Sequence, residues 1–192
     1  MIQKIGLFGG SFDPIHLGHI ITAQIVFEAR KLDKIIFMPC YFSPHKTDAK
    51  YAPPIHRLNM VMLAIKKYEH FSVSDFEISR NQISYTIDTI NELRKKYSDI
   101  ELIIGQDNLD VFDKWHKPDE IISKAKLVVL RRNFIKKNSF KNKYYESAIF
   151  VDTPIIDISS TEIKNRIKNN LRIDFLTGEE ISNYIIQNNL YR

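Results

Sequence analysis

The sequence contains a single cysteine, Cys40, in 192 residues. One thiol cannot form an internal disulfide, and this composition is typical of a protein kept in a reducing compartment. No apolar run approaches the length of a membrane span. The chain also lacks a charged and then apolar leader before its first strand-like run. These absences predict a cytoplasmic protein that has no membrane partner.

The composition predicts one globular domain over residues 1–192. Apolar residues make up 44% of the chain, which is typical of a protein that buries a core. The formal net charge of +5 suits either a nucleic acid or a small anionic substrate. Six lysines and arginines fall between Arg131 and Lys143, among asparagines and without an acidic residue. We interpret this stretch as a solvated surface loop and expect no nucleic-acid partner.

Strand-like and helix-like segments alternate along the chain. The strand-like runs are Lys4–Phe8, Lys34–Pro39, Phe71–Ser74, Ile100–Ile104, Lys126–Leu130 and Ala148–Val151. The helical patterns are Ile20–Lys31, Ile55–Tyr68, Thr86–Tyr97, Pro118–Lys124, Thr161–Asn169 and Glu179–Gln187. Such alternation favours right-handed βαβ units, and runs that are apolar throughout are typical of buried parallel strands. We predict an α/β fold with a doubly wound, mainly parallel sheet, helices on both faces and a C-terminal helical portion after Ser159.

The first strand leads into the first helix through the segment Gly9–His19, which reads GGSFDPIHLGH. Ligands of open α/β sheets bind in this crevice, where the helix N-terminus offers N–H donors and partial positive charge to phosphate. His16 and His19 are three residues apart, so one helix face can direct both imidazoles at the same phosphate. The alternative is an ordinary strand–turn–helix whose histidines are solvated caps.

This segment differs from the common phosphate loops. It lacks the lysine and hydroxyl pair of a Walker loop, and its glycines do not fit the dinucleotide fingerprint. It resembles the signature of the nucleotidyltransferase superfamily, His-x-Gly-His after a glycine-rich turn. That resemblance implies transfer of a nucleotidyl group from a nucleoside triphosphate to a phosphate or carboxylate, with release of pyrophosphate. We expect no protein-bound metal, because a zinc pair at His16 and His19 has no third ligand beside it.

Two further segments place polar groups on the ligand side of the predicted sheet. Ser43-Pro44-His45-Lys46 follows the second strand and offers an imidazole and an ammonium to phosphate, although an exposed loop lysine has the same pattern. Ser84–Thr89 opens a helix, where Ser84 or Thr86 can act as the N-cap. The amides of that helix start can also bind a carboxylate on a ligand.

The segment after the fourth strand carries another pair of candidates. Gly105-Gln106-Asp107 permits close approach of a ligand, and Asp107 either accepts from ribose hydroxyls or caps the next helix. Trp115 is the only tryptophan. It is either an anchor in the core or a platform on which an aromatic ring of the substrate stacks.

The segment Ile158–Arg166 begins the C-terminal helical portion. Ser159 with Glu162 three residues later predicts a capping box. The hydroxyls and amides at this helix start, followed by Lys164 and Arg166, also make a second phosphate site that would face the histidines.

Taken together, these segments resemble the bacterial nicotinate-nucleotide adenylyltransferases. The matching pieces occur in order along the whole chain: Gly9–His19, Pro44–Lys46, Ser84–Thr89, Gly105–Asp107 with Trp115, Ile158–Thr161, and Tyr184-Ile185 with Leu190-Tyr191. The resemblance implies a Rossmann-like sheet and adenylyl transfer from ATP to nicotinate mononucleotide in NAD synthesis. For such a reaction we expect Mg²⁺ to come bound to ATP with few protein ligands, as the chemistry of this ion favours.

The same resemblance implies a set of site residues. The catalytic residues would be His16, His19 and Lys46. ATP would contact Gly9, Gly10, Ser11, Gly18, Gly105, Asp107, Ser160, Thr161, Lys164 and Arg166. The acceptor would contact His45, Tyr85, Thr86 and Trp115, with its carboxylate near Thr86. The family commonly has arginine where Lys164 stands, and lysine lacks the bidentate fork, so Arg166 is an alternative contact for the leaving pyrophosphate.

Two other functions remain open at this point. Phosphopantetheine adenylyltransferase shares the His-x-Gly-His core but does not account for Ser84–Thr89 and Trp115. A nucleic-acid-binding or tRNA-acting module would use the basic charge, but the chain has no room for a separate RNA-binding domain. The sequence leaves the choice between a monomer and a homo-oligomer open.

Overall fold

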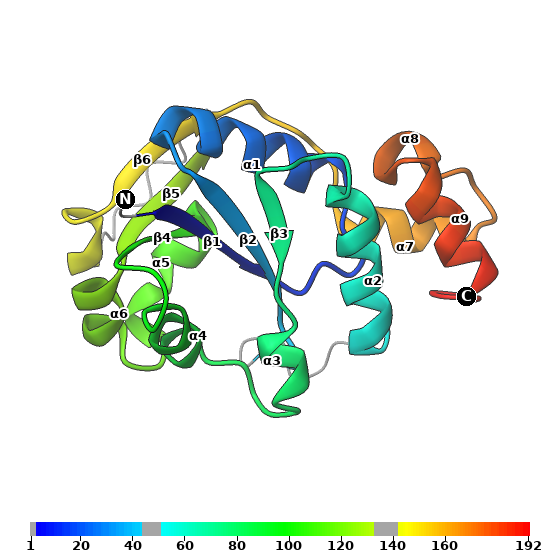
Figure 1. The fold of residues 1–192 in the computed structure, drawn as a ribbon. Helices are drawn as coiled ribbons and strands as arrows, with labels where there is room; N and C mark the ends of the chain where they lie inside the picture. The colour runs from blue at the N-terminus through cyan, green and yellow to red at the C-terminus, as the bar shows by residue number, and fades with distance from the viewer. Residues whose placement is uncertain (1–2, 44–50, 133–141) are drawn as a thin grey trace.

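A computed structural model describes residues 3–43, 51–132 and 142–192, and its centre is a parallel sheet (Figure 1). The sheet has six strands in the order β3-β2-β1-β4-β5-β6, and each neighbouring pair is parallel. The strands are β1 Lys4–Gly10, β2 Lys34–Pro39, β3 Phe71–Val73, β4 Asp99–Gly105, β5 Lys126–Arg132 and β6 Ile149–Thr153. This is the doubly wound order, so the predicted α/β fold is confirmed.

The middle of each strand is mostly apolar because both faces of the sheet are covered by helices. One face packs against α1 (Leu17–Arg30) and α2 (Pro54–Ile65). The C-terminal helices α7 (Ser160–Lys168), α8 (Asp174–Thr177) and α9 (Glu179–Gln187) extend the same core, with α8 in contact with α1 and α9 in contact with α2. The other face packs against α4 (Thr86–Leu93), α5 (Gln106–Asp110) and α6 (Pro118–Lys124). In Figure 1 the α7–α9 segment lies beside α2, at the far side of the molecule from β6.

Local sequence explains where the principal helices begin and end. Helix α1 buries Ile20, Ala23 and Val26, whose spacing of three residues forms one apolar stripe. It ends at Arg30, and the following Lys31 adopts the left-handed conformation at φ 50°. Helix α7 begins after Ser159, whose hydroxyl accepts from the Glu162 amide at 3.1 Å, so the predicted cap at Ser159 is confirmed.

The structure differs from the sequence prediction mainly in short elements. Helices α3 (Phe76–Ser79) and α8, and the 3₁₀ turns η1 (Phe112–Lys114) and η2 (Lys143–Tyr145), were not predicted, whereas the short helix expected between Asp107 and Trp115 is present as α5. Elements of one turn are too short to show a helical period. The predicted cap at Ser84 or Thr86 is wrong, because Tyr85 precedes α4 without a side-chain cap. The Ser84 hydroxyl instead accepts from the Tyr41 amide at 3.0 Å and joins α4 to the end of β2.

The strand order reverses between β1 and β4, and this point determines where a ligand can bind. Chain segments leave β1 and β4 towards opposite faces, which opens a crevice at their carboxyl ends. The motif loop Ser11–His16 lies at that edge, directly after β1. Within the described ranges, no helix is both long and apolar enough to cross a membrane.

Candidate active site

The two motif histidines lie together at the start of α1. His16 is the N-cap residue and His19 is in the first turn. Their ring centroids are 3.8 Å apart, and the His16 amide donates to His19 Nδ1 at 3.3 Å. The spacing therefore brings both imidazoles to one place, next to a helix N-terminus that favours anions. The rings can act as a joint donor site for phosphate oxygens.

Phe12 supports this pair from inside the motif loop. Its backbone is in the left-handed region at φ 47°, and its side chain is 2% exposed. The ring packs edge-on against Phe8 at 5.8 Å and His19 at 5.2 Å between centroids. It also lies under Gly10, where a Cβ atom would approach the ring to 3.0 Å. A larger residue at Gly10 would displace Phe12, and Phe12 in turn contacts the imidazole.

The histidines line the larger of two cavities at this edge. Its volume is about 710 Å³, which falls in the range of roughly 300–1,000 Å³ common for small-molecule sites. The sequence candidates that line it are His16, Gly18, His19, Gly105, Asp107, Ser159, Ser160 and Thr161. Imidazoles from α1 therefore face the N-terminus of α7, as the sequence predicted for a phosphate site held from two sides. Asp107 lies inside α5 rather than capping it, and its carboxylate is at the cavity wall.

A smaller cavity of about 190 Å³ adjoins the same edge. The sequence candidates that line it are Gly9, Gly10, Ser11, Tyr85, Thr86 and Trp115. Its size suits an aromatic ring better than a whole nucleotide. The Trp115 ring packs on Phe112 with centroids 5.0 Å apart, so it anchors the core, and it also forms part of the cavity wall.

The predicted ATP contacts do not all line one cavity, and Lys164 and Arg166 are in the lining of neither. Gly9, Gly10 and Ser11 line the smaller cavity with Trp115, whereas the histidines line the larger one. The end of β1 therefore lies between the two cavities. The predicted residues His45 and Lys46 lie outside the described residues.

Helix α7 packs directly on the motif loop. The Ser160 hydroxyl donates to the Pro14 carbonyl at 2.9 Å, and Lys164 Nζ lies 3.0 Å from Asp13 Oδ2. Arg166 has a different environment, because its guanidinium donates to the Arg172 carbonyl and lies over the Phe175 ring at 5.0 Å. The structure therefore directs Lys164 towards the motif loop and Arg166 towards α8.

Arg57 on α2 is a residue that the sequence analysis did not identify. It is fully buried and donates three hydrogen bonds to backbone carbonyls: Nη1 to Ser11 at 2.7 Å, Nη2 to Tyr41 at 3.0 Å and Nε to Ala52 at 3.1 Å. It holds together the motif loop, the end of β2 and the segment before α2. The only signal in the sequence is an arginine on an otherwise apolar helix face.

Two further residues of the smaller cavity were also missed. Glu77 on α3 lines the cavity and accepts from the Thr89 hydroxyl. Burial raises the pKa of Glu77, although hydrogen bonds from Thr89 and Ser84 oppose that shift. The raised pKa reduces the tendency of this carboxyl to carry a negative charge inside the cavity. His116 lines the same cavity, with its ring 4.5 Å from that of Tyr85, and its place beside Trp115 was the available signal.

Comparisons with known proteins agree with this geometry. The cytidylyltransferase-like family model matches residues 7–166. A probable nicotinate-nucleotide adenylyltransferase of Carboxydothermus hydrogenoformans is 40% identical over 98% of both chains. One of Caldicellulosiruptor saccharolyticus is 37% identical over 99% of this chain and all of the relative.

Solved structures share the fold. The Plasmodium falciparum nicotinic acid mononucleotide adenylyltransferase complexed with NaAD has a TM-score of 0.79 at 21% identity, covering 98% of this chain and 97% of that one. A putative nicotinate-nucleotide adenylyltransferase of Vibrio parahaemolyticus has a TM-score of 0.64 at 23% identity, covering 96% and 99%. Motif, fold and full-length identity agree, and the chain belongs to the cytidylyltransferase-like family and, within it, to the nicotinate-nucleotide adenylyltransferases.

Proposed function

We propose that this chain transfers the adenylyl group of ATP to nicotinate mononucleotide and releases pyrophosphate. The products are nicotinate adenine dinucleotide and pyrophosphate, as in NAD synthesis. The observation that carries the proposal is the pairing of two cavities at the β1–β4 switch point. One has imidazoles and a helix N-terminus for phosphates, and the other has an aromatic wall and the start of α4.

The chemistry requires little from the protein beyond position and charge. A phosphate oxygen of the acceptor attacks the α-phosphorus of ATP in line, and the bond from that phosphorus to the bridging oxygen of pyrophosphate breaks. The attacking phosphate is already ionised at neutral pH, so no strong base is needed. Catalysis then rests on alignment and on donors that stabilise the developing charge. We assign the donor role to His16 and His19.

ATP is proposed to occupy the larger cavity. The N-terminus of α7, with Ser160 and Thr161, would receive the β- and γ-phosphates opposite the histidines. Asp107 would accept from the ribose hydroxyls, next to Gly105. Lys164 is the better placed of the two candidate cations for pyrophosphate, because Arg166 is directed towards Arg172 and Phe175.

Mg²⁺ is proposed to arrive bound to the triphosphate. Mg²⁺ keeps several waters and commonly uses one or two carboxylates together with substrate phosphates. The larger cavity offers such carboxylates, because Asp107, Asp110 and Asp157 line it. An ion held in this way supplies charge neutralisation on the phosphates.

The acceptor is proposed to place its pyridine ring in the smaller cavity. The ring would stack on Trp115, while its carboxylate would accept from the first amides of α4 near Tyr85 and Thr86. Those amides have no partner within the helix, and the helix dipole favours an anion there. A carboxamide in the same position would direct its NH₂ donors at donors, which discriminates strongly. Nicotinate mononucleotide should therefore be preferred over nicotinamide mononucleotide.

The test is a pyrophosphate-release assay with ATP, Mg²⁺ and three acceptors at matched concentrations. We expect release with nicotinate mononucleotide, much less with nicotinamide mononucleotide and none with phosphopantetheine. A kcat/KM ratio near one for the two mononucleotides would refute the carboxylate site at α4 but not adenylyl transfer. Release only with phosphopantetheine, or only on addition of RNA, would refute the proposed reaction.

We propose a cytoplasmic setting for this reaction. One buried cysteine, Cys40, is consistent with a cytoplasmic protein. We propose nucleotides as the only partners that the site requires, with no role for a nucleic acid or a membrane.

A further inference from the structure

A buried carboxylate in the motif loop connects the loop to three other segments. Asp13 is 2% exposed. Its Oδ1 accepts from the Ala52 amide at 3.0 Å and from the Tyr191 hydroxyl at 2.7 Å, while its Oδ2 lies 3.0 Å from Lys164 Nζ. The loop is therefore held to the segment before α2, to the residues after α9 and to α7.

Tyr191 reaches Asp13 from a backbone conformation that bulky residues rarely adopt. Its φ is 67°, in the left-handed region, which carries a conformational cost that the surrounding contacts must offset. Leu190 is buried in the core beside it, and Lys164 Nζ lies 5.9 Å from the centre of the Tyr191 ring. Burial and then the nearby Asp13 charge raise the pKa of Tyr191, so its hydroxyl remains protonated and acts as the donor.

The carboxylate is close in sequence and in space to the proposed catalytic histidines. Asp13 precedes His16 by three residues, and the Ser160 hydroxyl holds the intervening Pro14 carbonyl at 2.9 Å. Ser160 and Lys164 are four residues apart and share one face of α7. A shift of Asp13 would therefore move both the loop that leads to His16 and its contact with the N-terminus of α7.

We propose that Tyr191 is a positioning residue for adenylyl transfer: its hydroxyl holds Asp13, and through Asp13 it fixes the motif loop that carries His16 against α7. The inference rests on the proposed function. Tyr191 is absent from the lining of both cavities, so its effect passes through Asp13 rather than through contact with a nucleotide.

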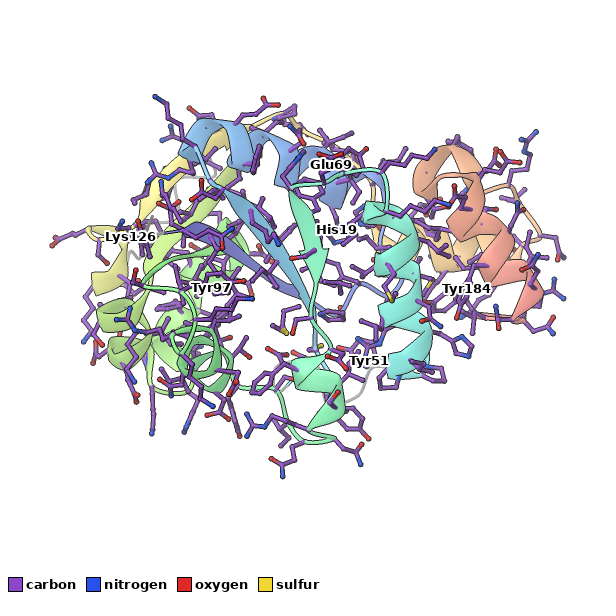
Figure 2. All side chains as sticks on the ribbon, viewed as in Figure 1. His19, Tyr51, Glu69, Tyr97, Lys126 and Tyr184 are labelled. Atoms are coloured by element: carbon purple, nitrogen blue, oxygen red, sulfur yellow. The ribbon has the colours of Figure 1, made fainter. Side chains whose placement is uncertain are left out.

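The chain contains a matched control for this hydroxyl. Tyr184 on α9 belongs to the same C-terminal helical portion, and Figure 2 shows it directed towards α2. Its hydroxyl lies 2.8 Å from His56 Nδ1 and accepts from Asn59 Nδ2 at 2.9 Å. Removal of either tyrosine hydroxyl breaks a hydrogen bond between this portion and the rest of the protein, but only Tyr191 reaches the motif loop.

The experiment compares Tyr191→Phe with Tyr184→Phe in the full chain, at a temperature well below both unfolding midpoints. We expect the kcat of Tyr191→Phe to fall about ten- to a hundredfold, the range that a small displacement of reacting groups can cause. The KM for nicotinate mononucleotide should not change, because the smaller cavity is not involved. Tyr184→Phe should lower the midpoint by a similar amount and keep the parental kcat.

A double substitution tests the route through Asp13. In the Asp13→Asn background, Tyr191→Phe should cause little further loss of kcat, because the two residues act as one unit. Additive losses would overturn the inference. Where Asp13→Asn does not fold, the pair Tyr191→Phe and Tyr184→Phe decides alone.

The outcomes separate this inference from the proposed function. An unchanged kcat for Tyr191→Phe, or an equal loss in Tyr184→Phe, overturns the positioning role and leaves adenylyl transfer intact. Failure of the unsubstituted chain to release pyrophosphate from ATP and any of the three acceptors overturns the proposed function and this inference with it.

Discussion

Two buried carboxylates with similar partners lie towards opposite ends of the sheet. Glu101 in β4 is fully buried and has Lys4 Nζ at 3.0 Å, and Asp13 beyond β1 is 2% exposed and has Lys164 Nζ at 3.0 Å. The two lysine side chains are exposed to almost the same degree, 24% and 26%. As isolated ion pairs the two would be expected to have similar effects.

The two carboxylates differ in the other groups that they bind. Glu101 also receives two hydrogen bonds from Arg30, each 2.8 Å long, so it joins the end of α1 to β4 at the edge away from both cavities. Asp13 accepts hydrogen bonds from the Tyr191 hydroxyl and the Ala52 amide, and it lies in the loop between the two cavities. The same kind of interaction therefore supports folding at one edge and, by our inference, turnover at the other. Substitutions at the two edges should separate these effects.

The largest expected effect is on turnover. It arises where the strands have their carboxyl ends, which we call the carboxyl edge of the sheet. Replacement of His19 by alanine removes a preorganised donor, which costs about 2.7–4 kcal/mol, or roughly a hundred- to a thousandfold in kcat. The free energy of unfolding, measured in urea, should change little, because His19 is only half-buried. A folded His19→Ala protein with nearly parental kcat would contradict the assignment.

The next largest effect is on the free energy of unfolding. It arises where the strands have their amino ends, which we call the amino edge of the sheet. Glu101→Ala leaves Arg30 and Lys4 without their carboxylate, and loss of one partner from a buried ion pair costs about 3 kcal/mol of unfolding free energy. Since both cations are about a quarter exposed, water can reach them and the cost should not exceed that figure. The kcat of the folded fraction should match that of the parent. A selective loss of kcat would show that the two edges are not independent.

The lysines that pair with the two carboxylates, Lys4 and Lys164, allow the most direct comparison of the two edges. Lys164→Ala should lower kcat/KM for ATP about tenfold, equivalent to roughly 1.4 kcal/mol of transition-state stabilisation. Lys4→Ala should instead lower the unfolding free energy by up to about 1 kcal/mol, because the pair is partly exposed, and leave kcat/KM unchanged. Lys164→Arg should retain activity, since it keeps the charge. If both alanine variants lose only stability, the edges do not differ and Lys164 has no role in ATP use.

Acid should weaken the ion pairs of Glu101. Burial raises the pKa of Glu101, but hydrogen bonds from Arg30 and Lys4 outweigh it and hold the pKa below its ordinary value. The unfolded chain, with the ordinary value of about 4.3, then binds the proton more readily. The contribution of Glu101 is therefore complete above that value and is lost as pH falls through the folded-state pKa. Urea titrations of the parent and Glu101→Gln at neutral and acid pH should converge as pH falls; a constant difference would contradict this.

The smallest effect is expected at Cys40, which lies at the carboxyl edge but carries no charge. Burial raises the pKa of this thiol, which keeps it protonated and poorly reactive. The proposed reaction uses the acceptor phosphate as nucleophile, so Cys40→Ser should keep kcat close to the parental value. Loss of turnover in the folded variant, or a labelled adenylyl-enzyme formed from ATP alone, would contradict a direct transfer.

Much of the fold followed from local pattern. The apolar runs predicted the six strands of the described sheet, and their alternation with helices predicted that the sheet is doubly wound and mainly parallel, because a βαβ unit is specified by consecutive residues. The position of His16 and His19 was also local, since three residues of helix bring the rings together. The cap at Ser159 followed for the same reason. Each of these features depends on residues that are close together in the sequence, and this made it predictable.

Tertiary packing alone decided the connections around the site. The Tyr191 hydroxyl meets Asp13 across 178 positions of sequence, and Arg57 selects carbonyls of three separate segments. Helix α7 could have directed either Lys164 or Arg166 at the motif loop, and its packing against that loop decided for Lys164. Such contacts carry no periodic signal, because a buried polar group takes whichever donors the packed helices bring within hydrogen-bond distance.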